Sequence, residues 1–147
     1  RNNRYDEARE YAQLATTAGA RLPYQHQDLA GHVAFGPLTP ALMGPEIEML
    51  DDRPDKALQL AERIPRDAGA GNTSGWDRHR LDVARAHLRL GNPDKATELM
   101  HEIRREHPLW LRYQQYARDI TRELLASRPR MPSQAMLDLA DFMGVEP

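Results

Sequence analysis

The turn at residues 91–93, Gly-Asn-Pro, constrains this sequence most, because it separates two segments of strong helical periodicity. Glycine suits the left-handed position just after a helix. Asparagine is a favourable N-cap, and proline fits a first helical turn, where no backbone N–H is needed. The apolar inner positions are Leu81, Ala84 and Leu88 before the turn and Ala96, Met100 and Ile103 after it. Residues 77–108 are therefore predicted to form a helical hairpin.

The rest of the chain is also predicted to be helical. The sequence has 19 Ala and 18 Leu but only 3 Val and 4 Ile, which disfavours a substantial β-sheet. Further helices are expected over residues 3–19, 39–50, 54–64, 109–126 and 134–143, with a short one near 26–34. Pro45 should kink or restart the second of these. The loop at 65–75 should be the most mobile interior segment.

Two of these predictions concern particular side chains. In the helix over 109–126, core spacing is found at Leu109, Tyr113, Tyr116, Ala117, Ile120 and Leu124. The last helix should be capped by Ser133 and should end at Gly144. The whole then reads as six or seven helices in antiparallel pairs.

The tetrapeptide Pro-Asp-Lys-Ala occurs twice, at residues 54–57 and 93–96, an interval of 39 residues. The alignment of the two copies also superposes Leu60 on Leu99 and Ile64 on Ile103. The chain is therefore predicted to contain an internal repeat.

The spacing of Gly91, Ala96, Met100, Ile103 and Pro108 resembles the tetratricopeptide repeat, and Ala84 falls at the small-residue position of its first helix. The resemblance implies one all-α domain over residues 1–147, in which antiparallel helical hairpins stack as a tetratricopeptide-like right-handed superhelix.

A second resemblance covers about residues 8–145. It is carried, in order, by Phe35-Gly36-Pro37, Leu50-Asp51-Asp52, Leu81-Asp82, Ala84-Arg85-Ala86, Leu139-Ala140 and Gly144-Val145. In this order they resemble the tetratricopeptide-like C-terminal regions of actinobacterial XRE-type helix-turn-helix transcriptional regulators. The family implies an N-terminal DNA-binding domain outside this chain, so that DNA is contacted only through that domain. It also implies a homodimer that senses a peptide, a small-molecule effector or a protein partner.

In such arrays the first helix of each hairpin lines a concave groove. The equivalent positions here are Arg78, Leu81, Asp82, Arg85, Leu88 and Arg89. Two interpretations are open. The three arginines could clamp a carboxylate or phosphate. Alternatively they form a solvated face neutralised within the chain, since Asp82 lies four residues after Arg78 and three before Arg85.

Catalysis and metal binding are not predicted. The six histidines lack metal-ligand spacing, and His87 is expected to be a packing residue. Trp76, Trp110, Tyr113 and Tyr116 either floor an aromatic pocket or, as is commoner at helical spacing, pack in the core. There is no recognisable acid–base pair or nucleophile motif, and no cofactor is implied.

Charge and composition bound the partners. A formal charge of −2 disfavours direct nucleic-acid binding, and there is no cysteine and no apolar run long enough to span a bilayer. A cytoplasmic protein without a membrane partner is expected. The first hypothesis is the sensing and dimerisation module of a bacterial transcriptional regulator. The alternatives are a tetratricopeptide-type protein-interaction scaffold without a DNA-binding domain and a helical enzyme domain that uses His87 or His79.

Overall fold

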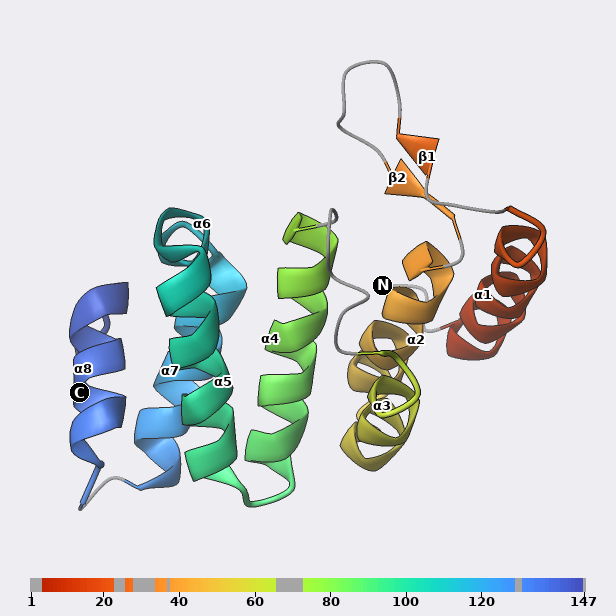
Figure 1. The fold of residues 1–147 in the computed structure, drawn as a ribbon. Helices are drawn as coiled ribbons and strands as arrows, with labels where there is room; N and C mark the ends of the chain where they lie inside the picture. The colour runs from red at the N-terminus through yellow and green to blue at the C-terminus, as the bar shows by residue number, and fades with distance from the viewer. Residues whose placement is uncertain are drawn as a thin grey trace. The chain divides into compact units, whose positions relative to one another are not determined.

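The computed structural model describes residues 4–22, 26–27, 34–36, 38–65, 73–128 and 131–146. Its elements, drawn in Figure 1, are α1 (Tyr5–Gly19), β1 (His26–Gln27), β2 (Ala34–Phe35), α2 (Leu38–Leu50), α3 (Pro54–Ala61), α4 (Thr73–Arg89), α5 (Pro93–Glu106), α6 (Pro108–Arg112), α7 (Gln115–Ser127) and α8 (Gln134–Met143). The predicted all-α class is confirmed. In the described part of the chain no helix is long and apolar enough to cross a membrane.

The two short strands correct one prediction. A helix was expected near residues 26–34, but His26 pairs with Phe35 and Gln27 with Ala34 in an antiparallel ladder. Residues 28–33 lie outside the described part of the chain. A glycine within this segment lowers its helix propensity, and the ladder gives the flanking backbone groups partners that a helix would otherwise supply. The predicted mobile loop falls largely on residues 66–72, which also lie outside the described residues.

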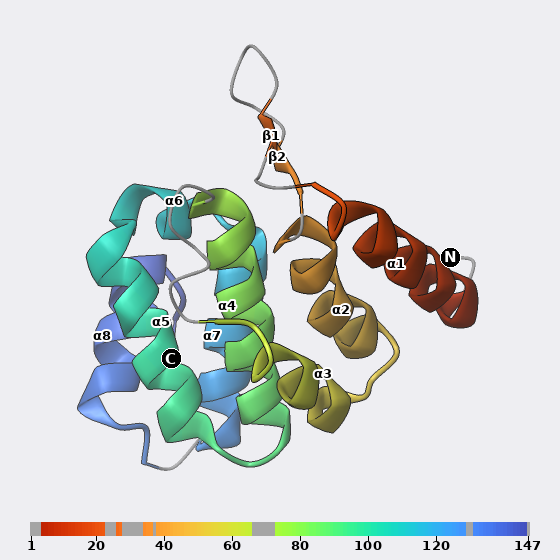
Figure 2. The same cartoon turned by 45° about the vertical axis from the view of Figure 1, so that its right-hand side comes forward.

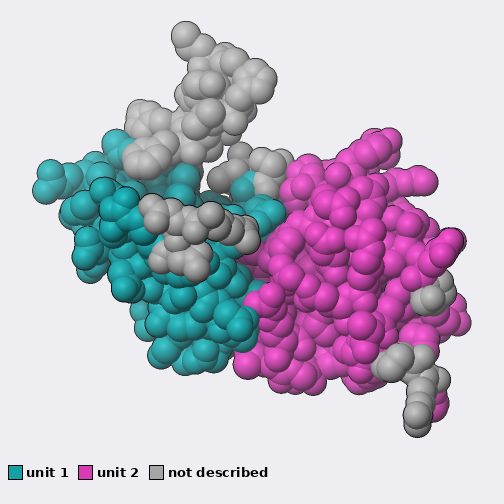
Figure 3. All heavy atoms as spheres, turned by 180° about the vertical axis from the view of Figure 1, so that it is seen from behind, with its two compact units in different colours: residues 1–79 teal, residues 80–147 magenta. Residues whose placement is uncertain are grey.

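The chain divides into two compact units, residues 1–79 and residues 80–147, shown in teal and magenta in Figure 3. The boundary falls inside α4, so this helix supplies residues to both units.

In unit 1, α2 packs against both α1 and α3 (Figure 2). Its buried apolar residues include Leu42, Ile47 and Met49 of α2 and Ala57 of α3. Pro45 was predicted to kink or restart this helix; the restart is wrong, because α2 continues through the buried proline as one helix. Gly44 permits the close approach of α3, because a Cβ added there would lie 3.3 Å from Leu60 Cδ1.

Unit 2 has a continuous apolar core. It is formed by α4, α5, α7 and α8, with contributions from α6 and the C-terminal segment: Leu81, Ala84, Leu88, Ala96, Met100, Ile103, Leu111, Ala117, Ile120, Leu124, Leu125, Met136, Leu139, Ala140, Met143 and Val145. The inner faces predicted for the hairpin at 77–108 are therefore confirmed as core.

The predicted helix over 109–126 is wrong in one respect, because the structure divides it into α6 and α7. Tyr113 N donates to Trp110 O at 3.3 Å and Gln114 N donates to Leu111 O at 3.0 Å, so the chain tightens and turns at the end of α6. Arg118 Nη2 donates to the Arg112 carbonyl at 2.8 Å. As a result the two residues expected to begin the core face are exposed: Leu109 is 72% and Tyr113 75% solvent-accessible.

The ends of three helices share one hydrogen-bond pattern. After α4, Asn92 N donates to His87 O at 2.9 Å and Gly91 N to Leu88 O at 3.0 Å, with a φ of 81° at Gly91. The same pair of bonds closes α2 around Asp52 and α8 around Gly144.

Of the two predicted N-cap side chains, Ser133 forms its cap hydrogen bond and Asn92 does not. Ser133 accepts a hydrogen bond from Met136 N at 3.3 Å, as expected. Asn92 is the N-cap residue of α5, but its side chain makes no cap hydrogen bond.

Candidate functional site

The predicted groove residues lie on α4, where the apolar and polar members separate. Leu81 and Leu88 are buried in the core of unit 2. Helical spacing explains this placement, since they share a face with the buried Ala84. The predicted groove residues that do not belong to the core are therefore the polar ones, Arg78, Asp82, Arg85 and Arg89. Whether they bind anything stays a prediction.

Asp82 is a buried acid with a phenol partner from another helix. Its carboxylate accepts a hydrogen bond from Tyr116 Oη at 2.7 Å, and Tyr116 lies at the start of α7. Burial raises the pKa of the Tyr116 hydroxyl, and the adjacent Asp82 carboxylate raises it further. The phenol therefore keeps its proton and donates the hydrogen bond that joins α7 to α4.

Arg85 joins the same group of side chains. Its Nε donates to Glu123 Oε2 at 3.1 Å, and its Nη2 donates to Glu123 Oε1. The guanidinium carbon also lies 5.2 Å from the centre of the Tyr116 ring. Burial lowers the pKa of Arg85, but the hydrogen bonds to Glu123 and Tyr116 outweigh it and leave the pKa raised. We call Asp82, Arg85, Tyr116 and Glu123 the α4–α7 network.

The other two arginines differ from Arg85. Arg78 belongs to unit 1, where its Nη2 lies 3.3 Å from Glu46 Oε1 on α2. Arg89 is exposed at the end of α4. Arg78 and Arg85 are thus both paired with carboxylates of other helices. An external anion at Arg85 would have to compete with Glu123 for a two-bond contact.

Sequence analysis missed Glu123 and the hydroxyl of Tyr116. It considered Tyr116 only as an apolar or aromatic-pocket residue and gave no role to Glu123. The signal was the spacing of seven residues between them, two helical turns, which places both on one side of α7. Nothing in the sequence specified that this side faces α4.

An open pocket of about 490 Å³ lies at the α4–α5 turn. It is lined by His87, Gly91, Asn92, Pro93, Asp94, Lys95 and Arg128. Arg128 Nη2 pairs with Asp94 Oδ2 at 2.8 Å, and Lys95 Nζ pairs with Glu98 Oε2 at 2.6 Å. Both cations of the lining therefore have acidic partners.

The histidines occupy different environments. His79 is buried, and its Nδ1 has no hydrogen-bond partner among the described residues. Burial lowers its pKa to about 4. His87, expected to be a packing residue, is half-buried and lines the open pocket.

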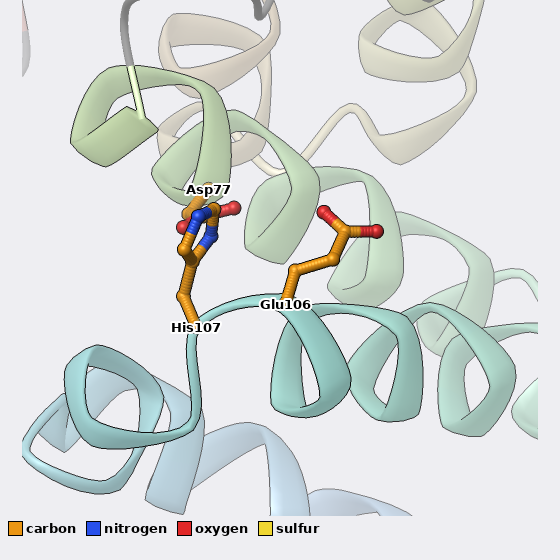
Figure 4. A group of neighbouring side chains, drawn as sticks. All are labelled: Asp77, Glu106 and His107. Carbon is orange, nitrogen blue, oxygen red and sulfur yellow. The ribbon is translucent and has the colours of Figure 1, made fainter.

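Glu106 and His107 lie at the end of α5, and Figure 4 shows both with Asp77 of α4. Asp77 belongs to unit 1, whereas Glu106 and His107 belong to unit 2.

The four aromatic residues considered for a ligand pocket do not share one environment. Trp110 and Tyr116 are partly buried against the core of unit 2. Tyr113 is exposed, and the ring centre of Trp76 lies 5.4 Å from that of His79 in unit 1, with the two planes tilted by 38°.

Comparison with known proteins adds no further constraint. No protein-family model, curated protein or solved structure matches this chain.

Proposed function

We propose that this chain is a recognition module, the sensing and dimerisation part of a bacterial transcriptional regulator. DNA would be contacted by a separate domain of that protein. The observation that supports the proposal most is the repeated turn: Pro-Asp-Lys-Ala begins both α3 and α5, and each copy follows the same two-bond helix end. Repeated helical hairpins are a common way to build an extended binding surface.

The finer architecture is part of the proposal. The hairpins would stack as a tetratricopeptide-like right-handed superhelix, in which each hairpin is rotated slightly relative to the next. A peptide, small molecule or protein that binds one curvature more tightly than another would shift the population towards it. In a homodimer, this shift would change the spacing of two DNA-binding heads.

The α4–α7 network is the proposed contact point for an acidic effector. Arg85 already holds Glu123, so an incoming carboxylate or phosphate would bind by exchange with that side chain. Glu123→Gln removes the competing charge and should raise affinity for such an effector, whereas Arg85→Ala should lower it. An effector whose affinity responds to neither substitution binds elsewhere.

Dimerisation can be tested without knowledge of the effector. The chain is fused to a helix-turn-helix head that represses a reporter gene only as a dimer. We expect the fusion to repress far more strongly than the head alone. Sedimentation equilibrium of the unfused chain should show a monomer–dimer equilibrium in parallel.

Repression equal to that of the head alone, with a strictly monomeric chain, would reject the dimerisation role. The interaction scaffold would then be the better account.

A further inference from the structure

The first helix of unit 1 packs against α2 mainly through small side chains. Its inward positions are small, with half-buried alanines at 8, 12 and 15, and Gly19 is its one buried residue. Two of its larger apolar side chains lie mostly in solvent, since Tyr11 is 69% and Leu14 65% exposed, whereas Tyr5 is half-buried. Because hydrophobic stabilisation scales with the apolar area removed from water, these methyl groups contribute little to docking.

A charge network supplies the specific attachment. Arg9 Nε on α1 donates to Glu48 Oε1 on α2 at 2.9 Å, and Arg9 Nη2 donates to Glu48 Oε2 at 3.4 Å and to Asp51. These hydrogen bonds, first those to Glu48 and then the one to Asp51, raise the pKa of Arg9. The Glu48 side chain is only 8% exposed, so its attraction to Arg9 is weakly screened by solvent.

Glu48 and Asp51 lie where a carboxylate needs a positively charged partner. Glu48 lies in the last turn of α2 and Asp51 just beyond it, where the negative end of the helix dipole disfavours carboxylates. The left-handed turn at Asp52 returns Arg53 to this end, with its Nη2 2.7 Å from Glu48 Oε2. Arg53 supplies one counter-charge from the α2–α3 connection, and Arg9 supplies the other from α1.

The α2–α3 hairpin has its own means of staying folded. Ala57 of α3 is buried, and Leu60 packs closely over Gly44 of α2. The hydrogen bond from Arg53 N to Glu48 O, at 2.8 Å, closes the turn without any group from α1. Loss of α1 from its place would therefore leave the hairpin intact.

We propose that α1 is a detachable arm, held on α2 by Arg9 as an electrostatic latch. Opening of the latch frees the acidic end of α2 while the hairpin stays folded. Rising ionic strength favours the open form, because Arg9 and Asp51 are partly solvent-accessible and salt screens their attraction more than that of the nearly buried Glu48. This inference goes beyond the proposed function and does not depend on it.

Hydrogen exchange of the whole chain, followed by mass spectrometry, tests the latch. Arg9→Ala leaves a nearly buried carboxylate with one counter-charge fewer, and we expect amide exchange in α1 to rise at least about tenfold. Exchange in the α2–α3 hairpin and in α5 should change less than about twofold. The matched control is Arg4→Ala, since Arg4 pairs only with Glu7 of α1 itself in the described contacts and both side chains are largely exposed. This control should behave like the unmodified chain.

Two further measurements keep the proposal open to refutation if Arg9→Ala does not fold. Glu48→Gln keeps the shape of the side chain but removes its charge, and it should also accelerate α1 exchange selectively. Sodium chloride added to the unmodified chain should do so progressively. Exchange in α1 that is unchanged in every case, or that rises together with exchange in α2 and α3, would overturn the detachable arm.

Discussion

The two helical hairpins of this protein share a turn and differ in what surrounds it. In α2–α3 the left-handed residue is Asp52, with a φ of 57°, and in α4–α5 it is Gly91, with a φ of 81°. In both, the residue after it is an N-cap with no side-chain cap bond, and a proline begins the next helix. The comparison shows that a short local pattern is enough to specify the turn.

The same comparison shows that the pattern does not specify packing. Ala57 and Ala96, at equivalent positions of the two copies, are both buried. Ile103 is also fully buried, among residues from α7 and α8, whereas its counterpart Ile64 is half-buried and lies beyond the end of α3. The second hairpin is therefore part of a larger core, and this difference should be measurable.

The largest expected effect is at that pair of isoleucines. Ile103→Ala should lower the free energy of unfolding by about 3–4 kcal/mol, because it leaves a cavity in a closed core. Ile64→Ala removes the same atoms from a half-exposed site and should cost only about 1 kcal/mol. Urea unfolding of both variants measures the difference. Equal losses would mean that the two hairpins are equally well packed.

The next largest effect is a loss of stability at acidic pH, which arises from His79 in unit 1. The folded-state pKa of His79 is about 4, below the ordinary 6.5, because burial disfavours the charged ring. The stability that depends on a neutral His79 is complete above pH 6.5 and is lost as pH falls towards 4, by up to about 3 kcal/mol. His79→Leu should remove this part of the pH dependence in urea unfolding between those values. A variant with the same pH profile as the unmodified chain would assign the acid sensitivity to another group.

A smaller effect is expected at Gly91. An added Cβ would meet no atom within 4 Å, so Gly91→Ala tests the left-handed backbone alone. The variant should lose about 1 kcal/mol in thermal or urea unfolding, the usual cost of a side chain at positive φ. A loss of several kcal/mol would instead indicate that the substitution rearranges the α4–α5 turn.

The smallest effect has the opposite sign and concerns the other hairpin. A residue with a Cβ is strained at a positive φ, whereas glycine is not. Asp52→Gly removes this strain and should raise the free energy of unfolding by about 0.5 kcal/mol. Differential scanning calorimetry can detect the small rise in melting temperature. A clear loss would show that the Asp52 side chain contributes more through its contacts than its backbone costs.

The fold class, most helix positions and the core of unit 2 could be predicted because they depend on local signals. Apolar spacing placed Leu81, Met100 and Ile103 in the core, and glycine marked the ends of α4 and α8. The break between α6 and α7 escaped prediction because helical periodicity continues across it. Only the competing turn bonds at Tyr113 and Gln114, and a carbonyl contact from Arg118, decide it.

The candidate site was less predictable for a physical reason. Helical spacing correctly placed Arg85 and Asp82 on one helix, and it left open whether the arginines clamp an external anion or are neutralised within the chain. The partners it could not supply are Glu123 and Tyr116, which lie more than thirty residues away. Contacts of this kind depend on which faces of two helices meet, and spacing within one helix does not encode that.

The course of α4 through both units matters for anyone who wishes to produce unit 2 alone. A fragment cut at residue 80 would begin in the middle of a helix. The backbone N–H groups of its first turn would lose their hydrogen-bond acceptors, and the helical turns that precede Leu81 would be missing. A fragment that begins at residue 73 keeps the whole helix and is the better choice for expression.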